Sequence, residues 1–233
     1  MNHPNYWKDK RVLITGGTSG LGRALALQLH RSGARVALVA RSQEKLDELN
    51  ALYPEILCIQ GDVSDKKAIY PITGEVHARL GDIDVLLNVA SYLGQTPLRL
   101  LIDTDCEDFE QVLQTNVLGP FRLSKAFLPE MLLRRRGVVV NISSNAAINA
   151  YSNWGSYSVS KAGIDHLSRI FDEEVKDHGV RFLSIDPGDM NTPMHFDAIP
   201  DADPGDLKEP EVSASEILDL LAQRDYSEVR RSL

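Results

Sequence analysis

The chain has 233 residues, of which 43% are hydrophobic and 25% are charged, and its formal net charge is -8. These values are typical of globular proteins and exclude a fibrous or disordered chain. The negative charge disfavours binding to nucleic acid or anionic membranes, because its field repels polyanions. No segment approaches the roughly 18 apolar residues of a membrane span, and the N-terminus lacks the apolar core of a signal peptide. We therefore expect a cytoplasmic protein with a single domain over residues 1–233.

The first predicted element is a strand over residues 11–15, followed by the glycine-rich sequence GGTSGLG, residues 16–22, and a helical pattern. A strand, a glycine turn and a helix in this order form a phosphate-binding unit. Glycines let the main chain approach a pyrophosphate, and the free N–H groups at the helix start face the anion. The spacing is TGxxxGxG, and with its flanking elements it predicts a dinucleotide site.

A second predicted strand, residues 34–40, leads directly into Arg41. Units that bind NAD place an acidic residue near this position for the ribose 2′-hydroxyl, whereas an arginine accommodates a 2′-phosphate. An arginine can bind phosphate through two parallel hydrogen bonds, and no carboxylate is present to repel it. The sequence therefore favours NADP over NAD. In the alternative interpretation, Arg41 is a solvated residue before a helix over 42–52 that Ser42 caps.

The rest of the chain alternates strands with helices, which predicts an α/β fold with a doubly wound parallel sheet. Further strands are expected at 56–60, 83–88, 138–142 and 180–185, and further helices at 64–80, 109–135, 157–177 and 211–222. Gly119 and Pro120 interrupt the longest helix, and Asn116 lies in the disturbed turn, where it either satisfies main-chain groups or holds a water. Residues 190–210 are acidic and proline-rich, and we expect them to form a mobile flap over a pocket.

Two other patterns suggest binding sites only at first sight. Cys58 and Cys106 have no CxxC spacing, so neither a disulfide nor a metal site is predicted, and we expect both to be small buried side chains. Arg134, Arg135 and Arg136 lie in the last turn of a predicted helix. We interpret them as complementing the helix dipole and not as a nucleic-acid patch.

The candidate chemistry lies between residues 141 and 163. Tyr157 and Lys161 are four residues apart in a predicted helix and so project from one face. The ammonium is expected to favour the phenolate and to bring the pKa of Tyr157 down toward neutral pH. Ser144 stands thirteen positions before Tyr157 at the end of a predicted strand, where its hydroxyl can reach the start of the next helix. Taken alone, such a pair is more often a solvated helix face.

Several motifs occur together in one order: TGGTSGLG, Asn88 after the fourth strand, Asn116, Ser144, the segment YSVSK, and Pro187-Gly188 followed by Thr192. In this order and spacing, residues 10–193 resemble the short-chain dehydrogenase/reductase family. The resemblance implies a Rossmann-type sheet of seven parallel strands and hydride transfer between a nicotinamide and a carbonyl or alcohol. Because the chain ends without an apolar last strand, we expect either six strands or a seventh atypical one formed by YSEVRRSL.

The resemblance also implies roles for individual residues. Tyr157 would be the general acid/base, Ser144 would orient and polarise the substrate oxygen, and Asn116 would hold a water in a proton relay. Lys161 would bind the nicotinamide ribose and lower the pKa of Tyr157, so both helix residues would also lie against the cofactor. The other residues implied to bind the cofactor are Gly16, Thr18, Ser19, Gly20, Leu21, Gly22, Arg41, Asp62, Val63, Asn88, Ala90, Pro187, Gly188 and Thr192.

The sequence also leaves some points open. The usual NNAG is here Asn88-Val89-Ala90-Ser91, and Ser143 and Ser144 are adjacent, so that only the spacing selects Ser144. The substrate is expected to face Asn145, Tyr151, Asn153, Trp154 and the segment from Met190 to Phe196. A homodimer through the helices that hold Asn116 and Tyr157 is expected, a tetramer less so. The leading hypothesis is an NADPH-dependent carbonyl reductase or alcohol dehydrogenase. Alternatives are a nucleotide-sugar epimerase or dehydratase and a non-catalytic NADP-binding redox sensor.

Overall fold

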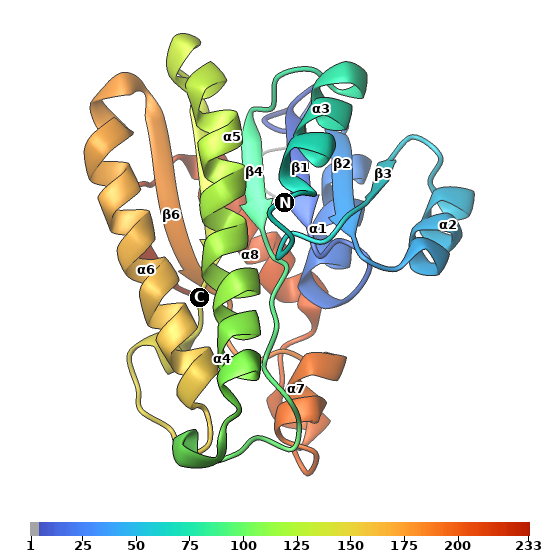
Figure 1. Cartoon of the computed structure of the whole chain (residues 1–233). Helices are drawn as coiled ribbons and strands as arrows, with labels where there is room; N and C mark the ends of the chain where they lie inside the picture. The colour runs from blue at the N-terminus through green and yellow to red at the C-terminus, as the bar shows by residue number, and fades with distance from the viewer. Residues whose placement is uncertain (1–4) are drawn as a thin grey trace.

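Seven strands form one parallel sheet in the computed structural model, which describes residues 5–233 (Figure 1). The strands are β1 (Arg11–Thr15), β2 (Arg35–Ala40), β3 (Leu57–Gln60), β4 (Val85–Asn88), β5 (Gly137–Ile142), β6 (Val180–Asp186) and β7 (Arg230–Ser232). The first six lie within two residues of their predicted bounds. The seventh is the atypical alternative: a short polar edge strand that pairs in parallel with β6.

The order of the strands across the sheet is β3-β2-β1-β4-β5-β6-β7. The chain first builds outward from β1 to β3, then crosses back and builds in the other direction from β4. The loops that follow β1 and β4 therefore diverge. In doubly wound sheets of this Rossmann type, ligands bind in the crevice at such a switch point, at the carboxyl ends of the strands.

Helices cover both faces of the sheet (Figure 1). They are α1 (Gly20–Arg31), α2 (Gln43–Leu52), α3 (Ile69–Arg79), α4 (Cys106–Leu113), α5 (Gly119–Leu133), α6 (Gly155–Val175), α7 (Pro193–Ala198) and α8 (Pro210–Gln223). Val12 and Ile14 of β1 pack in the core beneath α1 and α8, whereas Leu13 packs in the core beneath α3 and α5. Both faces are thus buried, which explains why the strands read as continuous apolar runs and not as alternating ones.

Two helices differ from their predicted bounds. The helix expected from residue 64 begins only at Ile69, because Asp62 and Asp65 accept hydrogen bonds from main-chain N–H groups two residues ahead and so form turns. The helix expected over 109–135 is two helices, α4 and α5, separated by a π-helical turn, Gln114–Leu118. This turn coincides with the interruption that Pro120 predicts.

The interpretation of the three arginines needs correction. α5 ends at Leu133, so they lie just beyond the helix. Arg134 and Arg136 form ion pairs with the buried carboxylate of Asp84, at the amino end of β4. These ion pairs therefore hold Arg134 and Arg136 at the amino ends of the strands, opposite the carboxyl ends. The ion pairs, and not the helix dipole, account for the positions of Arg134 and Arg136.

The cysteines match only part of their prediction. Cys58 and Cys106 are free thiols; Cys58 is partly buried, but Cys106, at the start of α4, is exposed. The expectation that both are buried is wrong, because the first turn of α4 faces solvent. Within residues 5–233, no helix combines the length and the apolar composition that crossing a membrane requires.

Candidate active site

A cavity of about 570 Å³ runs along the carboxyl ends of the strands. Its lining includes sixteen of the eighteen predicted site residues, drawn from loops after six different strands. They are Gly16, Thr18, Ser19, Gly20, Leu21, Gly22, Arg41, Asp62, Val63, Ala90, Ser144, Tyr157, Lys161, Pro187, Gly188 and Thr192. Asn88 and Asn116 do not line it. The sequence motifs, dispersed over some 180 residues, therefore converge on one site.

The glycine turn between β1 and α1 is a close-packed cradle. A Cβ atom on Gly16 would lie 2.8 Å from the Cα atom of Ala90, and one on Gly22 would overlap the carbonyl oxygen of Gly16. Gly16 also has a positive φ of 71°, which side chains disfavour. Ser19 makes no side-chain capping bond at the start of α1, and the first turn holds no acidic residue. The N–H groups of this turn are thus suited to bind a pyrophosphate.

At one end of the cavity lie two cations, Arg41 and Lys45. Both are exposed, and within residues 5–233 neither side chain forms a hydrogen bond or an ion pair. Ser42 caps α2 by accepting a hydrogen bond from the N–H of Lys45 at 3.3 Å. Lys45 was missed in the sequence, although it lies one helical turn beyond Arg41, a spacing that could have revealed it. The pair and the capped helix start would fit an additional phosphate.

The loop after β4 is held by Thr15. Its hydroxyl accepts hydrogen bonds from the N–H groups of Val89 and Ala90, both at 3.1 Å. Asn88 itself is buried behind the cavity wall, where its amide donates to Asn141 at 2.8 Å. The sequence predicted Asn88 as a cofactor ligand; it instead joins β4 to β5, and Ala90 reaches the cavity.

Tyr157, Lys161 and Ser144 meet at the inner part of the cavity. The ammonium of Lys161 lies 5.2 Å from the centre of the Tyr157 ring and donates a hydrogen bond to the carbonyl of Ile142 at 2.8 Å. Ser144 follows β5, and its hydroxyl lies near enough to the Tyr157 phenol to lower the pKa of that phenol. The adjacent Ser143 hydroxyl is buried and without a partner within residues 5–233. The spacing argument therefore selected the serine that contacts the tyrosine.

The pKa of Tyr157 contradicts one prediction. Burial raises the pKa of Tyr157 to about 12; hydrogen bonds from Ser144 and Ser91 lower it, and the carboxylate of Asp186 raises it. Burial also lowers the pKa of Lys161 to about 8. The expectation that the lysine brings the tyrosine toward neutral pH is thus wrong for these side chains, because loss of hydration outweighs the attraction. Tyr157 is held as a neutral proton donor.

Asn116 lies in the π-helical turn, and its side chain is fully engaged. Its amide oxygen accepts from the N–H of Tyr92 at 2.7 Å and from the Ser91 hydroxyl at 3.3 Å. Its amide nitrogen donates to the carbonyl of Tyr92 at 2.8 Å and to the hydroxyl of Ser160 at 2.9 Å. The side chain thus fixes the loop after β4 against α6. The side chain therefore satisfies nearby main-chain groups, the first of the two roles left open, and the water of a proton relay stays a prediction.

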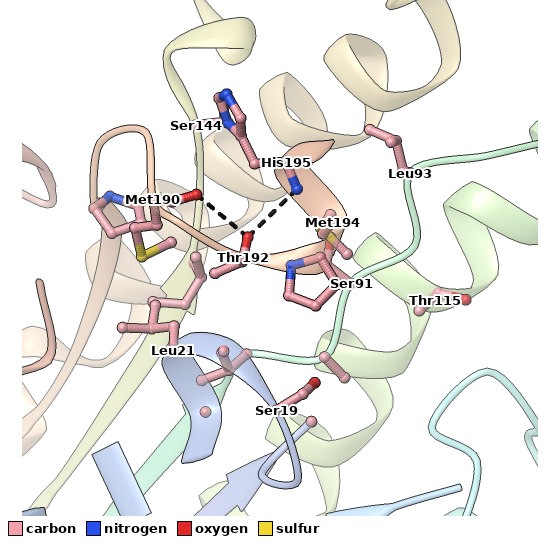
Figure 2. A pocket seen from close by; sticks show the side chains of 18 of the residues that line it. Ser19, Leu21, Ser91, Leu93, Thr115, Ser144, Met190, Thr192, Met194 and His195 are labelled. Atoms are coloured by element: carbon pink, nitrogen blue, oxygen red, sulfur yellow. Dashed lines mark hydrogen bonds between the residues drawn. The ribbon is translucent and has the colours of Figure 1, made fainter. Parts of the chain in front are cut away.

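Ser91 is a residue whose importance the sequence did not reveal. It occupies the place of the glycine in NNAG; its hydroxyl donates to the amide oxygen of Asn116 and lowers the pKa of Tyr157. It lines the cavity (Figure 2). The departure from NNAG thus places a second hydroxyl, besides that of Ser144, near enough to lower the pKa of Tyr157.

The other wall of the cavity is mainly apolar and comes from the segment after β6. Met190, Thr192 and Met194 lie across the cavity from the glycine turn, and His195 also belongs to the lining (Figure 2). Trp154 also lines it, with its ring 5.7 Å from that of Tyr157. Of the residues expected to face the substrate, Asn145, Tyr151 and Asn153 lie outside the lining.

The segment expected to form a flap has a defined base, whereas its mobility stays a prediction. It contains α7, capped by Thr192, and its two ends are joined where Met190 pairs with Lys208. The N–H of Asn191 donates to the carbonyl of Lys208 at 2.8 Å, and the N–H of Lys208 donates to that of Asp189 at 3.0 Å. The segment is therefore a closed loop with a short helix at its start.

Known proteins resemble the chain over most of its length. A family model for short chain dehydrogenase matches residues 10–202. A 2-(R)-hydroxypropyl-CoM dehydrogenase from Xanthobacter autotrophicus is 33% identical over 188 residues, covering 78% of this chain and 75% of the relative. A fatty acyl-CoA reductase from Acinetobacter baylyi is 34% identical over 195 residues, covering 80% of this chain and 64% of the relative.

Solved structures agree in fold. A short-chain dehydrogenase from Streptomyces avermitilis has a TM-score of 0.86 at 30% identity, covering 97% of this chain and 88% of that one. A short chain dehydrogenase from Shigella flexneri, complexed with NADP, has a TM-score of 0.83 at 26% identity, covering 91% of this chain and 92% of that one. Because the family model covers most of the residues and the seven-stranded sheet matches these structures, the chain belongs to the short-chain dehydrogenase/reductase family of oxidoreductases.

Proposed function

We propose that the protein is an NADP-dependent oxidoreductase that transfers hydride between NADPH and a carbonyl or alcohol, with Tyr157 as general acid/base. The observation that carries the proposal is the arrangement of one continuous cavity. Along the order of the strands, the cations follow β2, the glycine turn follows the neighbouring β1, and Ser144, with the phenol of Tyr157 near it, follows β5. A dinucleotide with a 2′-phosphate has its charges and its reactive ring in the same order.

The residues present fit this cofactor. The uncapped start of α1 suits the pyrophosphate, and Arg41 with Lys45 suits the 2′-phosphate. Asp62, Val63 and Ala90 would lie against the adenosine part, and Pro187, Gly188 and Thr192 against the nicotinamide part, all as lining residues. When bound, the nicotinamide supplies or accepts the hydride at the substrate carbon.

The proton chemistry follows from the raised pKa of Tyr157. As hydride reaches a carbonyl carbon, the electron pair of the C=O bond moves to the oxygen, which becomes basic. Tyr157 donates its phenolic proton to that oxygen, and the Ser144 hydroxyl stabilises the developing negative charge. Lys161, with its positive charge 5.2 Å from the ring centre, stabilises the phenolate that remains. In the reverse direction the phenolate removes the proton from the alcohol.

The cofactor preference is tested by thermal shift and affinity. We expect NADPH to raise the melting temperature more than NADH does, and Arg41→Asp to reverse this order. Loss of one charge-assisted phosphate contact, worth about 1.5–3 kcal/mol, weakens NADPH binding by roughly 10- to 100-fold. Arg35→Asp makes the same charge change at the exposed opposite end of β2 and should leave both affinities unchanged. Absence of a shift with either cofactor would refute the proposal.

We also propose a homodimer through α6. Val159 and Ile170 are 48% and 45% exposed, and with Gly163 and His166 they form one stripe at helical spacing on the outer face of this helix. Val159→Glu is expected to convert a dimer to a monomer in sedimentation equilibrium. A wild-type protein that sediments as a monomer at micromolar concentration would contradict this assembly.

A further inference from the structure

Three charged side chains lie beside the reaction site, and the mechanism above uses none of them; Asp186 lines the cavity, whereas Asp165 and Arg230 lie outside its lining. Arg230 of the edge strand β7 is only 13% exposed, and Asp165 and Asp186 are 7% and 9% exposed. The guanidinium donates to Asp165 at 2.9 Å and to Asp186 at 3.3 Å. Burial of three charges is expensive unless each is paired, and here one arginine pairs with two carboxylates.

This cluster is connected directly to the reaction site. Arg230 donates a hydrogen bond to the main-chain carbonyl of Ser144 at 3.3 Å, and Lys161 donates to that of Ile142 at 2.8 Å. Two cations therefore hold carbonyls two residues apart at the end of β5. Asp165 is also one helical turn beyond Lys161 on the inner face of α6, as Lys161 is one turn beyond Tyr157.

The charges around Lys161 balance. From its own helix it faces Tyr157 and the anionic Asp165, and from β6 the anionic Asp186, while Arg230 of β7 pairs with both carboxylates. Two positive and two negative charges thus share this buried region. Without Arg230 the region would carry a net negative charge, and Ser144 would lose a main-chain hydrogen bond.

We propose that Arg230 is a positioning residue of the reaction site: it orients the Ser144 segment through its carbonyl and neutralises the two carboxylates that face Lys161. The inference rests on the proposed function for its relevance to turnover, although the charge balance itself can be measured without cofactor or substrate. In this proposal the polar edge strand β7 both completes the sheet and supplies Arg230 to the reaction site.

The signs of the effects follow from the charges. Arg230→Met leaves two carboxylates with one cation, which favours the protonated amine, so the pKa of Lys161 rises above its value of about 8. Asp165→Asn leaves one carboxylate with two cations, so the pKa of Lys161 falls. The same changes move the pKa of Tyr157 in the same directions. Opposite shifts from two variants of one cluster distinguish charge from mere damage to the fold.

A control with the same architecture lies on the same helix. Arg181 of β6 pairs with the buried Asp172 of α6 at 2.8 and 3.0 Å, almost two turns beyond Asp165. Arg181→Met removes a comparable pair and should cost similar stability. Because it lies away from the catalytic end of α6, it should leave the pKa of Lys161 unchanged.

The experiment is an NMR titration of protein labelled with [13Cε]lysine, with the Lys161 signal assigned by its absence in Lys161→Met. We expect Arg230→Met to shift the Lys161 midpoint upward and Asp165→Asn to shift it downward, each by about one pH unit, with no shift in Arg181→Met. An unmoved midpoint in Asp165→Asn, or an equal shift in Arg181→Met, would overturn the proposal. If Arg230→Met does not fold, the shift of the Lys161 midpoint in Asp165→Asn still tests the charge balance of the cluster.

Turnover supplies a second readout. With NADPH and a panel of aldehydes and ketones, Arg230→Met should lower kcat with little change in the affinity for NADPH and shift the pH profile upward. Arg230→Lys, which keeps the charge, should restore the position of the profile. A loss confined to KM with an unmoved profile would refute the positioning role. If no carbonyl is reduced at all, the proposed function fails while the NMR titration still tests the charge balance.

Discussion

Tyr157→Phe is expected to lower turnover by roughly 10²- to 10⁴-fold, the usual contribution of a positioned acid/base, while NADPH continues to bind. The substitution removes one oxygen atom and keeps the ring that packs against Trp154 and Leu93. The burial that raises the pKa of Tyr157 to about 12 keeps the proton on the phenol over the physiological range. Without that oxygen, the site loses the phenolic proton that the substrate oxygen would receive. Steady-state kinetics and the thermal shift with NADPH measure the two effects separately.

A matched control is available six residues earlier. Tyr151 is 45% exposed and does not line the cavity, so Tyr151→Phe makes the same chemical change outside the site and should leave turnover intact. Equal activities of the wild type and Tyr157→Phe would contradict the assignment of the acid/base. If neither protein turns over any carbonyl while both bind NADPH, the redox-sensor alternative gains support.

Lys161→Met is expected to abolish turnover and yet to stabilise the fold at pH 7. Lys161 is only 3% exposed, and burial lowers its pKa to about 8, so the folded protein holds a charge in a site that disfavours it. Methionine fills nearly the same volume without a charge, although the carbonyl of Ile142 loses its hydrogen bond. The net gain is the free energy that corresponds to the lowered pKa of Lys161, minus the contribution of the lost hydrogen bond. The free energy of unfolding should therefore rise by about 1–2 kcal/mol. Urea unfolding measures it.

The gain should depend on pH in a defined window. The pKa of Lys161 is lower in the folded protein than the ordinary value of 10.5 in the unfolded chain, so the wild type gains stability as pH rises from about 8 to 10.5. The part of the difference that comes from the charge is therefore full below pH 8 and vanishes above 10.5, where the variant keeps only the loss of its hydrogen bond to Ile142. Lys125→Met, on the exposed side of α5, should show no such difference. A constant difference across the window would show that packing, not charge, causes it.

Most of the fold could be predicted because it rests on local patterns. Six strands buried on both faces give continuous apolar runs, and Ser42 and Pro120 signalled a helix start and an interruption that the structure contains. β7 could not be predicted with the same clarity, since Arg230 and Ser232 lack the apolar pattern of a strand. Its position follows from pairs between Arg230 and carboxylates far along the chain, which no local window can reveal.

The parts of the site that depend on main-chain geometry could be predicted from the sequence. The parts that depend on side-chain burial and side-chain hydrogen bonds were predicted less well. Gly16 and Gly22 must be glycines, because a Cβ atom would meet main-chain atoms, and the sequence motif records that need. The pKa of Tyr157 was predicted in the wrong direction, because spacing reveals the nearby Lys161 but not the extent of burial. Asn88 was assigned to the cofactor, whereas its amide is occupied by Asn141 across the sheet.

The π-helical turn of residues 114–118 also has a consequence for how the chain tolerates change. α4 packs on α6, whereas α5 packs on α3. The two helices on either side of the π turn therefore contact different neighbours. A π turn adds one residue to a helix, which rotates everything before it by about 100° relative to everything after it. Deleting one residue there would restore a regular helix while turning Asn116 and α4 away from α6. The π turn thus sets the rotation of α4 relative to α5. We therefore expect insertions and deletions within it to be tolerated less well than substitutions.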